Sequence, residues 1–324
     1  MASVLVTGGA GFIGSHTCKA LKTAGFESVV VDNLSTGHQH NVRWSRFAKV
    51  DVRDRPGLDE VFRHHEPEAV IHFAASAYVG ESVTDPAKYY SNNVAGMRTL
   101  LDAAAQAGVK HFIFSSSCAT YGIVDAVPIA ETTPQSPINP YGRTKLICEW
   151  MLSDYAARYG MKYVALRYFN AAGADPDGEL KEEHAPETHL IPLAILAAIG
   201  KRDRLSIFGN DYPTPDGTCV RDYIHVSDLA DAHVQACQYL LSGGDSVAVN
   251  LGGGKGHSIC EVIAEIEAIA DTKVPFAFAP RRPGDPPILV ADTSLAQRTI
   301  GFQPRRSSLS SVVSSAVRSM ANSL

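Results

Sequence analysis

Short apolar runs alternate with amphipathic segments along the first half of the chain. The apolar runs predict buried strands at residues 4–7, 28–32, 47–50, 69–73, 111–115 and 162–167. Segments with apolar side chains at helical spacing predict helices over residues 12–21, 86–107 and 140–159. Strands that alternate with helices are typical of a parallel, doubly wound sheet covered on both faces. The pattern therefore predicts the α/β class.

The pattern changes after Asn170. Residues 171–186 are rich in glycine, proline and charge and predict a loop, and short elements with many prolines follow. We expect a sheet domain over residues 1–170, with return segments near 218–252 that include a strand at 247–250. Residues 171–324 then form a smaller mixed α/β lobe. Apolar residues at helical spacing within 307–320 predict an amphipathic helix.

Composition and charge exclude several classes of protein. The net charge is -5 and basic residues form no cluster, which argues against a nucleic-acid partner. The longest apolar run, residues 190–199, contains Pro192 and is shorter than the about 20 residues that cross a bilayer. The chain enters a predicted strand at once, without a secretory signal pattern. We expect a cytoplasmic protein without a membrane partner.

Cysteine and histidine spacing gives no indication of a metal site. The six cysteines are scattered without CxxC spacing, as is typical of a reducing compartment. The pairs His38/His40 and His64/His65 lack further cysteine or histidine at ligand spacing. We therefore expect no metal.

A glycine-rich turn links the first strand to the first helix. Gly8, Gly11 and Gly14 allow a tight turn and a close backbone approach, and a helix N-terminus offers N–H groups to a pyrophosphate. Asp32 ends the second strand, where a carboxylate accepts hydrogen bonds from an adenosine ribose and repels a 2′-phosphate. This arrangement predicts a Rossmann-type domain with NAD rather than NADP as its cofactor.

A phenol and an ammonium lie one helical turn apart in the predicted helix 140–159. Tyr141 and Lys145 project from the same helix face, and Ser117 follows the strand at 111–115. Carboxyl ends of parallel strands are where open α/β sheets bind ligands, so these groups can converge on one substrate oxygen. Lowering a tyrosine pKa from about 10 toward 7 needs about 4 kcal/mol, which Lys145 and a nicotinamide cation could supply. Ser117, Tyr141 and Lys145 are the candidate catalytic residues.

Longer stretches carry a family resemblance. They are residues 31–34, 72–75, 79–82, 92–94, 167–173 and 217–230, including Arg-Tyr-Phe-Asn and Val-Arg-Asp-Tyr-Ile-His-Val. Over nearly the whole chain the sequence resembles the UDP-glucose 4-epimerases of the extended short-chain dehydrogenase/reductase family, especially their bacterial exopolysaccharide-associated branch. The resemblance implies an isomerase of galactose metabolism that inverts C4 of a UDP-hexose through a 4-keto sugar, using tightly bound NAD. Tyr141 would exchange the proton, Ser117 would bind the same oxygen, and Lys145 would hold the nicotinamide ribose.

The resemblance also implies binding residues and an assembly. The cofactor contacts would be Gly8, Gly11, Phe12, Ile13, Gly14, Asp32, Asn33, Asp51, Val52, Phe73, Ala74, Ala75, Asn92 and Lys145. The substrate contacts would be Ser117, Tyr141, Asn170, His189, Leu190, Phe208, Arg221, Arg282, Asp285 and Leu289. Guanidinium groups suit a diphosphate, which supports the two arginines. A homodimer through the helices near 86–107 and 140–159 is implied as well.

Other functions stay open at this point. Nucleotide-sugar 4,6-dehydratases and decarboxylases need a carboxylate just after the strand-end hydroxyl, and residues 118–121 contain none. A UDP-pentose 4-epimerase acting on xylose or arabinose sugars shares every motif. Leu289 lies where the family controls room for a 2-acetamido group, so a UDP-N-acetylhexosamine is a further alternative. A non-catalytic NAD-sensing scaffold is disfavoured by the intact Ser117, Tyr141 and Lys145.

Overall fold

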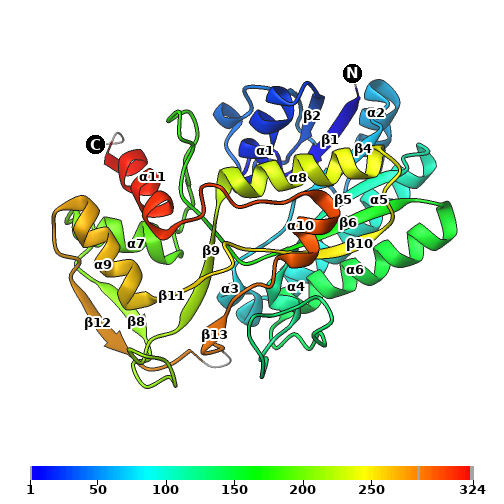
Figure 1. Cartoon of the computed structure of the whole chain (residues 1–324). Coiled ribbons are helices and arrows are strands. Elements are labelled where there is room, and N and C mark those ends of the chain that lie inside the picture. Colours follow the sequence, from blue (N-terminus) through cyan, green and yellow to red (C-terminus); the bar gives the residue numbers. More distant parts are fainter. Residues whose placement is uncertain (1, 283–284, 322–324) are drawn as a thin grey trace.

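A parallel sheet dominates the larger part of the molecule (Figure 1). This computed structural model describes residues 2–282 and 285–321. Within them, seven strands form one sheet in the order β10-β6-β5-β4-β1-β2-β3. The strands are β1 (Ser3–Thr7), β2 (Glu27–Val31), β3 (Arg46–Ala48), β4 (Ala69–His72), β5 (His111–Ser117), β6 (Lys162–Tyr168) and β10 (Val247–Leu251). The strand order reverses between β1 and β4, which opens a ligand crevice at their carboxyl ends. The predicted fold class is confirmed.

Helices cover both faces of this sheet. One face carries α1 (Phe12–Thr23), α8 (Val226–Leu241) and α10 (Ser294–Ile300), and the other carries α2 (Arg55–His65), α5 (Gly96–Gln106) and α6 (Pro140–Tyr159). Val4 and Val6 pack in the first layer and Leu5 in the second. Side chains alternate between the faces of a strand, so a strand covered on both sides reads as one continuous apolar run. This is why the strands were readable from the sequence.

Some helices differ from the sequence prediction. The helix expected over 86–107 is three pieces, α4 (Pro86–Tyr89), a π-helix (Tyr90–Ala95) and α5. The prediction assigned no helix to α2, although Asp54 caps it by accepting a hydrogen bond from the Gly57 N–H, with a proline in the first turn. That cap-and-proline pattern is a typical helix start and was available in the sequence. A short α3 (Val79–Thr84) precedes α4, and 3₁₀ turns span Gln39–Asn41 and Cys118–Thr120.

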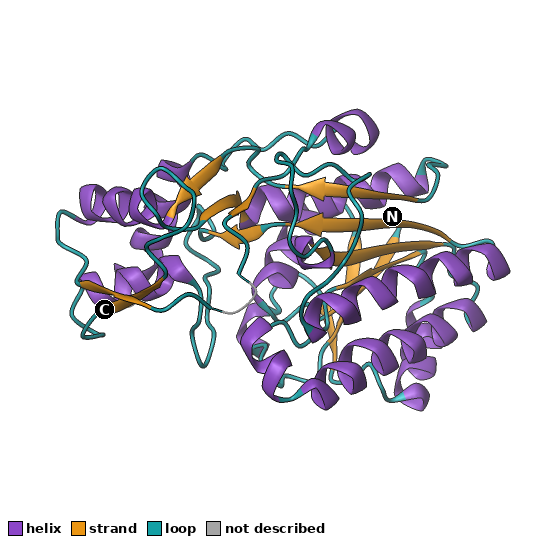
Figure 2. Cartoon of the chain, turned by 90° about the horizontal axis from the view of Figure 1, so that it is seen from below, coloured by secondary structure: helices purple, strands orange, loops and turns teal. Residues whose placement is uncertain are grey.

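The remaining elements form a smaller lobe beside the large sheet (Figure 2). Its strands are β7 (Asn170–Ala172), β9 (Val220–His225), β11 (Gly256–Ser258) and β13 (Ile288–Leu289), with a separate pair of β8 (Leu205–Phe208) and β12 (Phe276–Ala279). Its helices α7 (Leu190–Ala198), α9 (Ile259–Ala270) and α11 (Leu309–Ala321) share an apolar core. The predicted return strand at 247–250 and the C-terminal amphipathic helix are confirmed as β10 and α11.

No helix within residues 2–282 and 285–321 combines the length and the hydropathy needed to cross a bilayer.

Candidate active site

The glycine loop between β1 and α1 leaves no room for side chains. Gly8 has a φ of +73°, and a Cβ added there would lie 2.6 Å from the Ala74 backbone nitrogen. A Cβ on Gly14 would lie 2.3 Å from the Gly8 carbonyl oxygen. Gly11 is the N-cap of α1, so the N–H groups of the first helical turn, at Phe12 and Ile13, begin beside this loop. The loop is shaped for backbone contact with an anionic group.

Asp32 is fixed to the glycine loop. One of its carboxylate oxygens accepts a hydrogen bond from the Ala10 N–H at 3.1 Å, and the other accepts one from the Leu34 N–H at 2.8 Å. Burial raises the pKa of Asp32, and these two hydrogen bonds oppose that rise. The carboxylate is therefore held at the end of β2, where the sequence places a ribose acceptor.

The next predicted cofactor residues form a connected polar edge. Asn33 donates a side-chain hydrogen bond to Asp51 at 2.9 Å. The Arg53 guanidinium contacts both carboxylate oxygens of Asp51 and holds the pKa of that carboxyl well below its usual range. Val52 is buried directly beside them. These residues lie after β2 and β3, on the crevice side of the sheet.

Asn93 joins the loop after β4 to the candidate catalytic helix, and the sequence analysis missed this residue. Its side chain accepts a hydrogen bond from the Ser76 N–H and donates to the Ser76 carbonyl oxygen and to the Thr144 hydroxyl, all within 3.0 Å. Its predicted neighbour Asn92 donates to the Asn93 side chain. Phe73, Ala74 and Ala75 lie in the same loop. Asn93 is 2% exposed, and this burial distinguishes it from Asn92.

The structure brings the three candidate catalytic residues together. Asn139 caps α6 and starts the helix, so Tyr141 lies in its first turn and Lys145 in its second. The Lys145 ammonium donates to the Ser115 carbonyl oxygen at 2.7 Å and lies 5.8 Å from the centre of the Tyr141 ring. Ser117 ends β5, where its hydroxyl accepts a hydrogen bond from the Ala119 N–H at 3.1 Å and lies near enough to the Tyr141 phenol to affect its pKa. All three side chains are nearly buried.

The pKa values of the protein groups in this site follow mainly from burial. Burial raises the pKa of Tyr141 above its usual value, and nearby Tyr168 adds to the rise, while the Ser117 hydroxyl opposes it. Burial also lowers the pKa of Lys145 to about 8. The protein groups alone therefore do not lower the pKa of Tyr141. Burial disfavours the charged form of each group, the phenolate of Tyr141 and the ammonium of Lys145, and this cost was not visible in the sequence.

Most predicted substrate residues gather in the smaller lobe. Arg221 on β9 forms an ion pair with Asp285 at 2.5 Å, and Leu289 on β13 pairs with Arg221 in the strand register. The Arg282 guanidinium lies 3.9 Å from the centre of the Phe208 ring.

Two further predicted substrate positions lie on neighbouring elements. Asn170 donates to the Asp222 carbonyl oxygen at 2.8 Å and so stays beside β9. His189 is the N-cap of α7, and Leu190 begins that helix.

A buried polar network behind the site was also missed. The Glu149 carboxylate pairs with Arg167 at 2.6 Å and accepts a hydrogen bond from the Ser116 hydroxyl at 2.5 Å. Arg167 donates to the Tyr121 hydroxyl, which donates to Asn250 on β10. The network ties α6 to the carboxyl ends of β5, β6 and β10. Glu149 follows Lys145 by four residues, so the helical spacing could have placed it on the same face.

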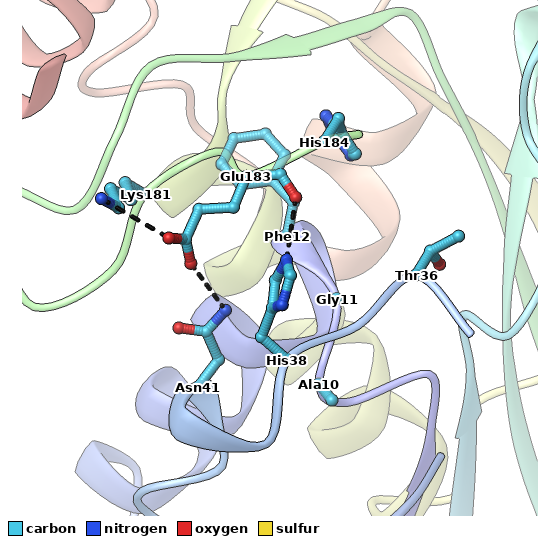
Figure 3. Close-up of a pocket in the computed structure, with 9 residues that line it drawn as sticks. All are labelled: Ala10, Gly11, Phe12, Thr36, His38, Asn41, Lys181, Glu183 and His184. Carbon is cyan, nitrogen blue, oxygen red and sulfur yellow. Dashed lines mark hydrogen bonds and ion pairs between the residues drawn. The ribbon is translucent and has the colours of Figure 1, made fainter. Parts of the chain in front are cut away.

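A charged loop crosses the glycine loop (Figure 3). The Glu183 carbonyl oxygen accepts from His38 at 3.2 Å, and its carboxylate contacts Asn41 and Lys181. Together with Ala10, Gly11, Phe12, Thr36 and His184, these residues line a pocket. Lys19 of α1 pairs with Asp175, Asp177 and Glu179 farther back in the same loop. The loop that the sequence predicted over 171–186 is therefore anchored at both ends to the sheet side.

The sheet topology, the glycine loop and the group formed by Ser117, Tyr141 and Lys145 define a dinucleotide-dependent enzyme of the short-chain dehydrogenase/reductase type. A family model described as the NAD dependent epimerase/dehydratase family matches residues 4–252. The chain belongs to this family. The glycine cradle and the anchored Asp32 carboxylate fit NAD, and NAD as the cofactor of an isomerase-type enzyme is confirmed.

Proteins similar to this chain in sequence and in structure match it over almost its whole length. A UDP-glucose 4-epimerase from Rhizobium meliloti (strain 1021) is 56% identical, over 94% of this chain and 92% of its own length. The structure of a UDP-glucose 4-epimerase from Brucella ovis in complex with NAD is 57% identical, with a TM-score of 0.96 and coverage of 98% of both chains. One from Bifidobacterium longum in complex with NAD+ and UDP is 37% identical with a TM-score of 0.93, covering 99% of this chain and 98% of its own. The predicted family resemblance is confirmed.

Proposed function

We propose that this chain catalyses the reversible C4 epimerisation of a UDP-hexose, UDP-glucose to UDP-galactose, with tightly bound NAD. The observation that carries the proposal is the convergence of Ser117, Tyr141 and Lys145 at the carboxyl end of β5, next to the glycine loop. The relatives that cover nearly the whole chain support the substrate class.

The proposed chemistry divides between the cofactor and the side chains. NAD, when bound, supplies a reversible hydride acceptor for C4 of the sugar. Tyr141 takes the proton of the 4-hydroxyl and returns it, and Ser117 hydrogen-bonds the same oxygen. Lys145, held by the Ser115 carbonyl, is placed to bind the nicotinamide ribose and to favour the ionised phenol. The sugar emerges inverted when the 4-keto form turns over in the pocket before reduction.

The cofactor contacts proposed from the resemblance occupy the crevice side of the sheet. They are Gly8, Gly11, Phe12, Ile13, Gly14, Asp32, Asn33, Asp51, Val52, Phe73, Ala74, Ala75, Asn92 and Lys145. Asn93 is added as a positioning residue, because it holds the loop after β4 against α6.

The UDP contacts are proposed in the smaller lobe, with Arg221 and Arg282 binding the diphosphate. Asn170, His189, Leu190, Phe208, Asp285 and Leu289 complete this set. Because Asp285 already pairs with Arg221, the diphosphate has to share or displace that carboxylate. UDP then stays fixed while the sugar turns.

The test uses purified protein and UDP-galactose without added NAD. We expect UDP-glucose to appear in a chromatographic assay, since the cofactor remains bound between turnovers. No conversion with or without added NAD would contradict the proposal. UDP-xylose and UDP-N-acetylglucosamine are run in parallel. If the enzyme converts either of these sugars faster than UDP-galactose, that sugar is the preferred substrate.

We also infer two functional parts of the chain. Residues 1–170, with return segments near 218–252, would bind NAD, and residues 171–324 would bind the UDP-sugar. The position of β10 in the large sheet supports this division.

The six free cysteines support the cytoplasm as the location. Cell fractionation with a tagged chain would test it.

A homodimer is proposed through the helices near residues 86–107 and 140–159, the segment from α4 to α5 and helix α6. Trp150 on α6 is 59% exposed and Tyr90 in the π-helix before α5 is 40% exposed, so both helical segments offer apolar contact area. Trp150→Glu should convert a dimer into monomers in sedimentation velocity. Ile123→Glu, at an exposed residue outside these segments, is the matched control and should leave the dimer intact. A monomeric wild type would contradict the assembly.

A further inference from the structure

A cluster of two histidines and two glutamates lies in the loop before α7. Glu182, His184, Glu187 and His189 each direct one ligand-type atom to a common centre, and all four atoms lie within 4.8 Å of one another. The sequence analysis weighed only the adjacent histidine pairs and overlooked this set. Its members come from one short segment, and the loop's fold places them face to face.

The distances between these atoms match the spacing of ligands around one ion. Glu182 Oε1 lies 3.1 Å from His184 Nδ1 and 2.8 Å from His189 Nδ1. Glu187 lies 2.9 Å from His189 Nδ1 and 3.6 Å from His184 Nδ1. Ligands at about 2.0–2.2 Å from a tetrahedral zinc ion are about 3.3–3.6 Å apart. Small side-chain shifts would bring the shorter distances in the cluster to the spacing that a zinc ion requires.

Hydrogen bonding leaves part of the cluster unsatisfied. His189 Nδ1 and Glu187 form a hydrogen bond. Glu182 Oε1 and His184 Nδ1 are buried and make only ion-pair contacts within the cluster, without hydrogen-bond geometry. The Glu182 side chain is 9% exposed. A buried carboxylate oxygen aimed at imidazole nitrogens without a directed hydrogen bond is costly unless a cation completes it.

The neighbouring acidic cluster behaves differently. Asp175, Asp177 and Glu179 surround the Lys19 ammonium, with each carboxylate 2.7–2.8 Å from Nζ. A protein cation already fills that centre. The histidine–glutamate cluster instead contains two imidazole side chains, at His184 and His189. Imidazole nitrogen is a preferred ligand of transition metals, whereas Mg²⁺ and Ca²⁺ prefer oxygen ligands.

We propose that Glu182, His184, Glu187 and His189 form a binding site for a divalent transition metal, with Zn²⁺ the best match. Glu182, His184 and Glu187 also line a groove next to α11, which gives an ion a path from solvent. The metal would fix the loop to the start of α7 through His189. It would also hold His184 against Phe12 of the glycine helix, where the rings are 6.1 Å apart. The site includes none of the proposed catalytic residues Ser117, Tyr141 and Lys145, and it shares His189 with the proposed UDP contacts.

The test is a titration of tag-free, chelator-treated protein with ZnCl₂, followed by calorimetry and by counting the bound metal. We expect one Zn²⁺ per chain, with affinity reduced by about 100-fold or more in the double variant His184→Gln/His189→Gln. The double variant His64→Gln/His65→Gln removes an adjacent histidine pair on α2 and should bind like the wild type.

Glu182→Gln provides a milder variant should the double variant fail to fold, and it should also weaken binding. Stoichiometric binding that survives in Glu182→Gln and in the folded cluster variant would overturn the site, as would a wild type that binds no Zn²⁺. None of these measurements uses catalytic activity, so the site can fail while the proposed epimerase function stands.

Discussion

The two sides of the crevice are built differently. On the sheet side, Tyr141, Lys145 and Asn93 are nearly buried, and Lys145 and Asn93 are fixed by hydrogen bonds to backbone carbonyl oxygens. On the smaller lobe, Arg221 and Asp285 are partly exposed and bind each other. A buried, hydrogen-bonded group has one stable position, whereas an ion pair that solvent and ligand can reach can exchange partners. The groups that we propose to react are thus held rigidly, and the proposed UDP-binding side can adjust to its ligand.

The largest expected effect comes from removing the phenol on the rigid side. Tyr141→Phe should lower kcat by about 10²–10⁴-fold, because general acid–base catalysis contributes roughly that much. Bound NAD should remain, since the glycine loop is untouched. Turnover of UDP-galactose and the absorbance of released cofactor measure both effects. Tyr159→Phe on the same helix is the control, and a fully active Tyr141→Phe would show that another group carries the proton.

A second prediction compares ion pairs on the two sides. Glu149→Ala leaves Arg167 buried without its partner and should lower the free energy of unfolding by about 3–5 kcal/mol. Asp285→Ala removes the partly exposed partner of Arg221 and should cost about 1 kcal/mol or less. Urea unfolding of both variants provides the values. An equal decrease in the free energy of unfolding in the two variants would contradict the proposed difference in rigidity.

The third prediction concerns pH and the buried Lys145. Its pKa in the folded chain is lowered to about 8 by burial, below the usual value of 10.5 in the unfolded chain. Between these values the unfolded state holds the proton and the folded state does not, so the stability contributed by this group rises with pH. The difference in unfolding free energy between wild type and Lys145→Met should change by about 2–3 kcal/mol in favour of the wild type between pH 7 and pH 10. A flat difference would show that the ammonium is well solvated.

The smallest effect is expected for substrate choice in the adjustable lobe. Leu289 lies opposite Arg221 in the strand register. A bulkier tyrosine there should reduce any turnover of UDP-N-acetylglucosamine relative to UDP-galactose by about 10-fold, the scale of a modest steric change in a pocket. Competition kinetics with the two substrates measure the ratio. Leu289→Met keeps the volume and should leave the ratio unchanged, whereas an unchanged ratio in Leu289→Tyr would place the 2-acetamido group elsewhere.

The sequence predicted the sheet side better than the other side. Buried parallel strands read as apolar runs, and Gly8, Gly11 and Gly14 carry a local pattern. The spacing of Tyr141 and Lys145 correctly predicted that the two side chains lie close together on α6. Contacts between segments distant in the chain left no such pattern.

Asn93 and the Glu149–Arg167 pair were therefore found only when the fold brought such segments together. The Glu182–His189 cluster lies in one short segment, and it was recognised only from the conformation of that loop. The lowered pKa of Lys145 was likewise invisible, because burial depends on packing.

The most direct test of the central claim follows the hydrogen at C4. UDP-galactose carrying deuterium at C4 is incubated with the enzyme in ordinary water, and the UDP-glucose formed is examined by mass spectrometry and NMR. If Tyr141 exchanges only the hydroxyl proton while the carbon-bound hydrogen leaves and returns within the site, the product keeps its deuterium at C4. Loss of deuterium to water would show proton abstraction from carbon and contradict the account.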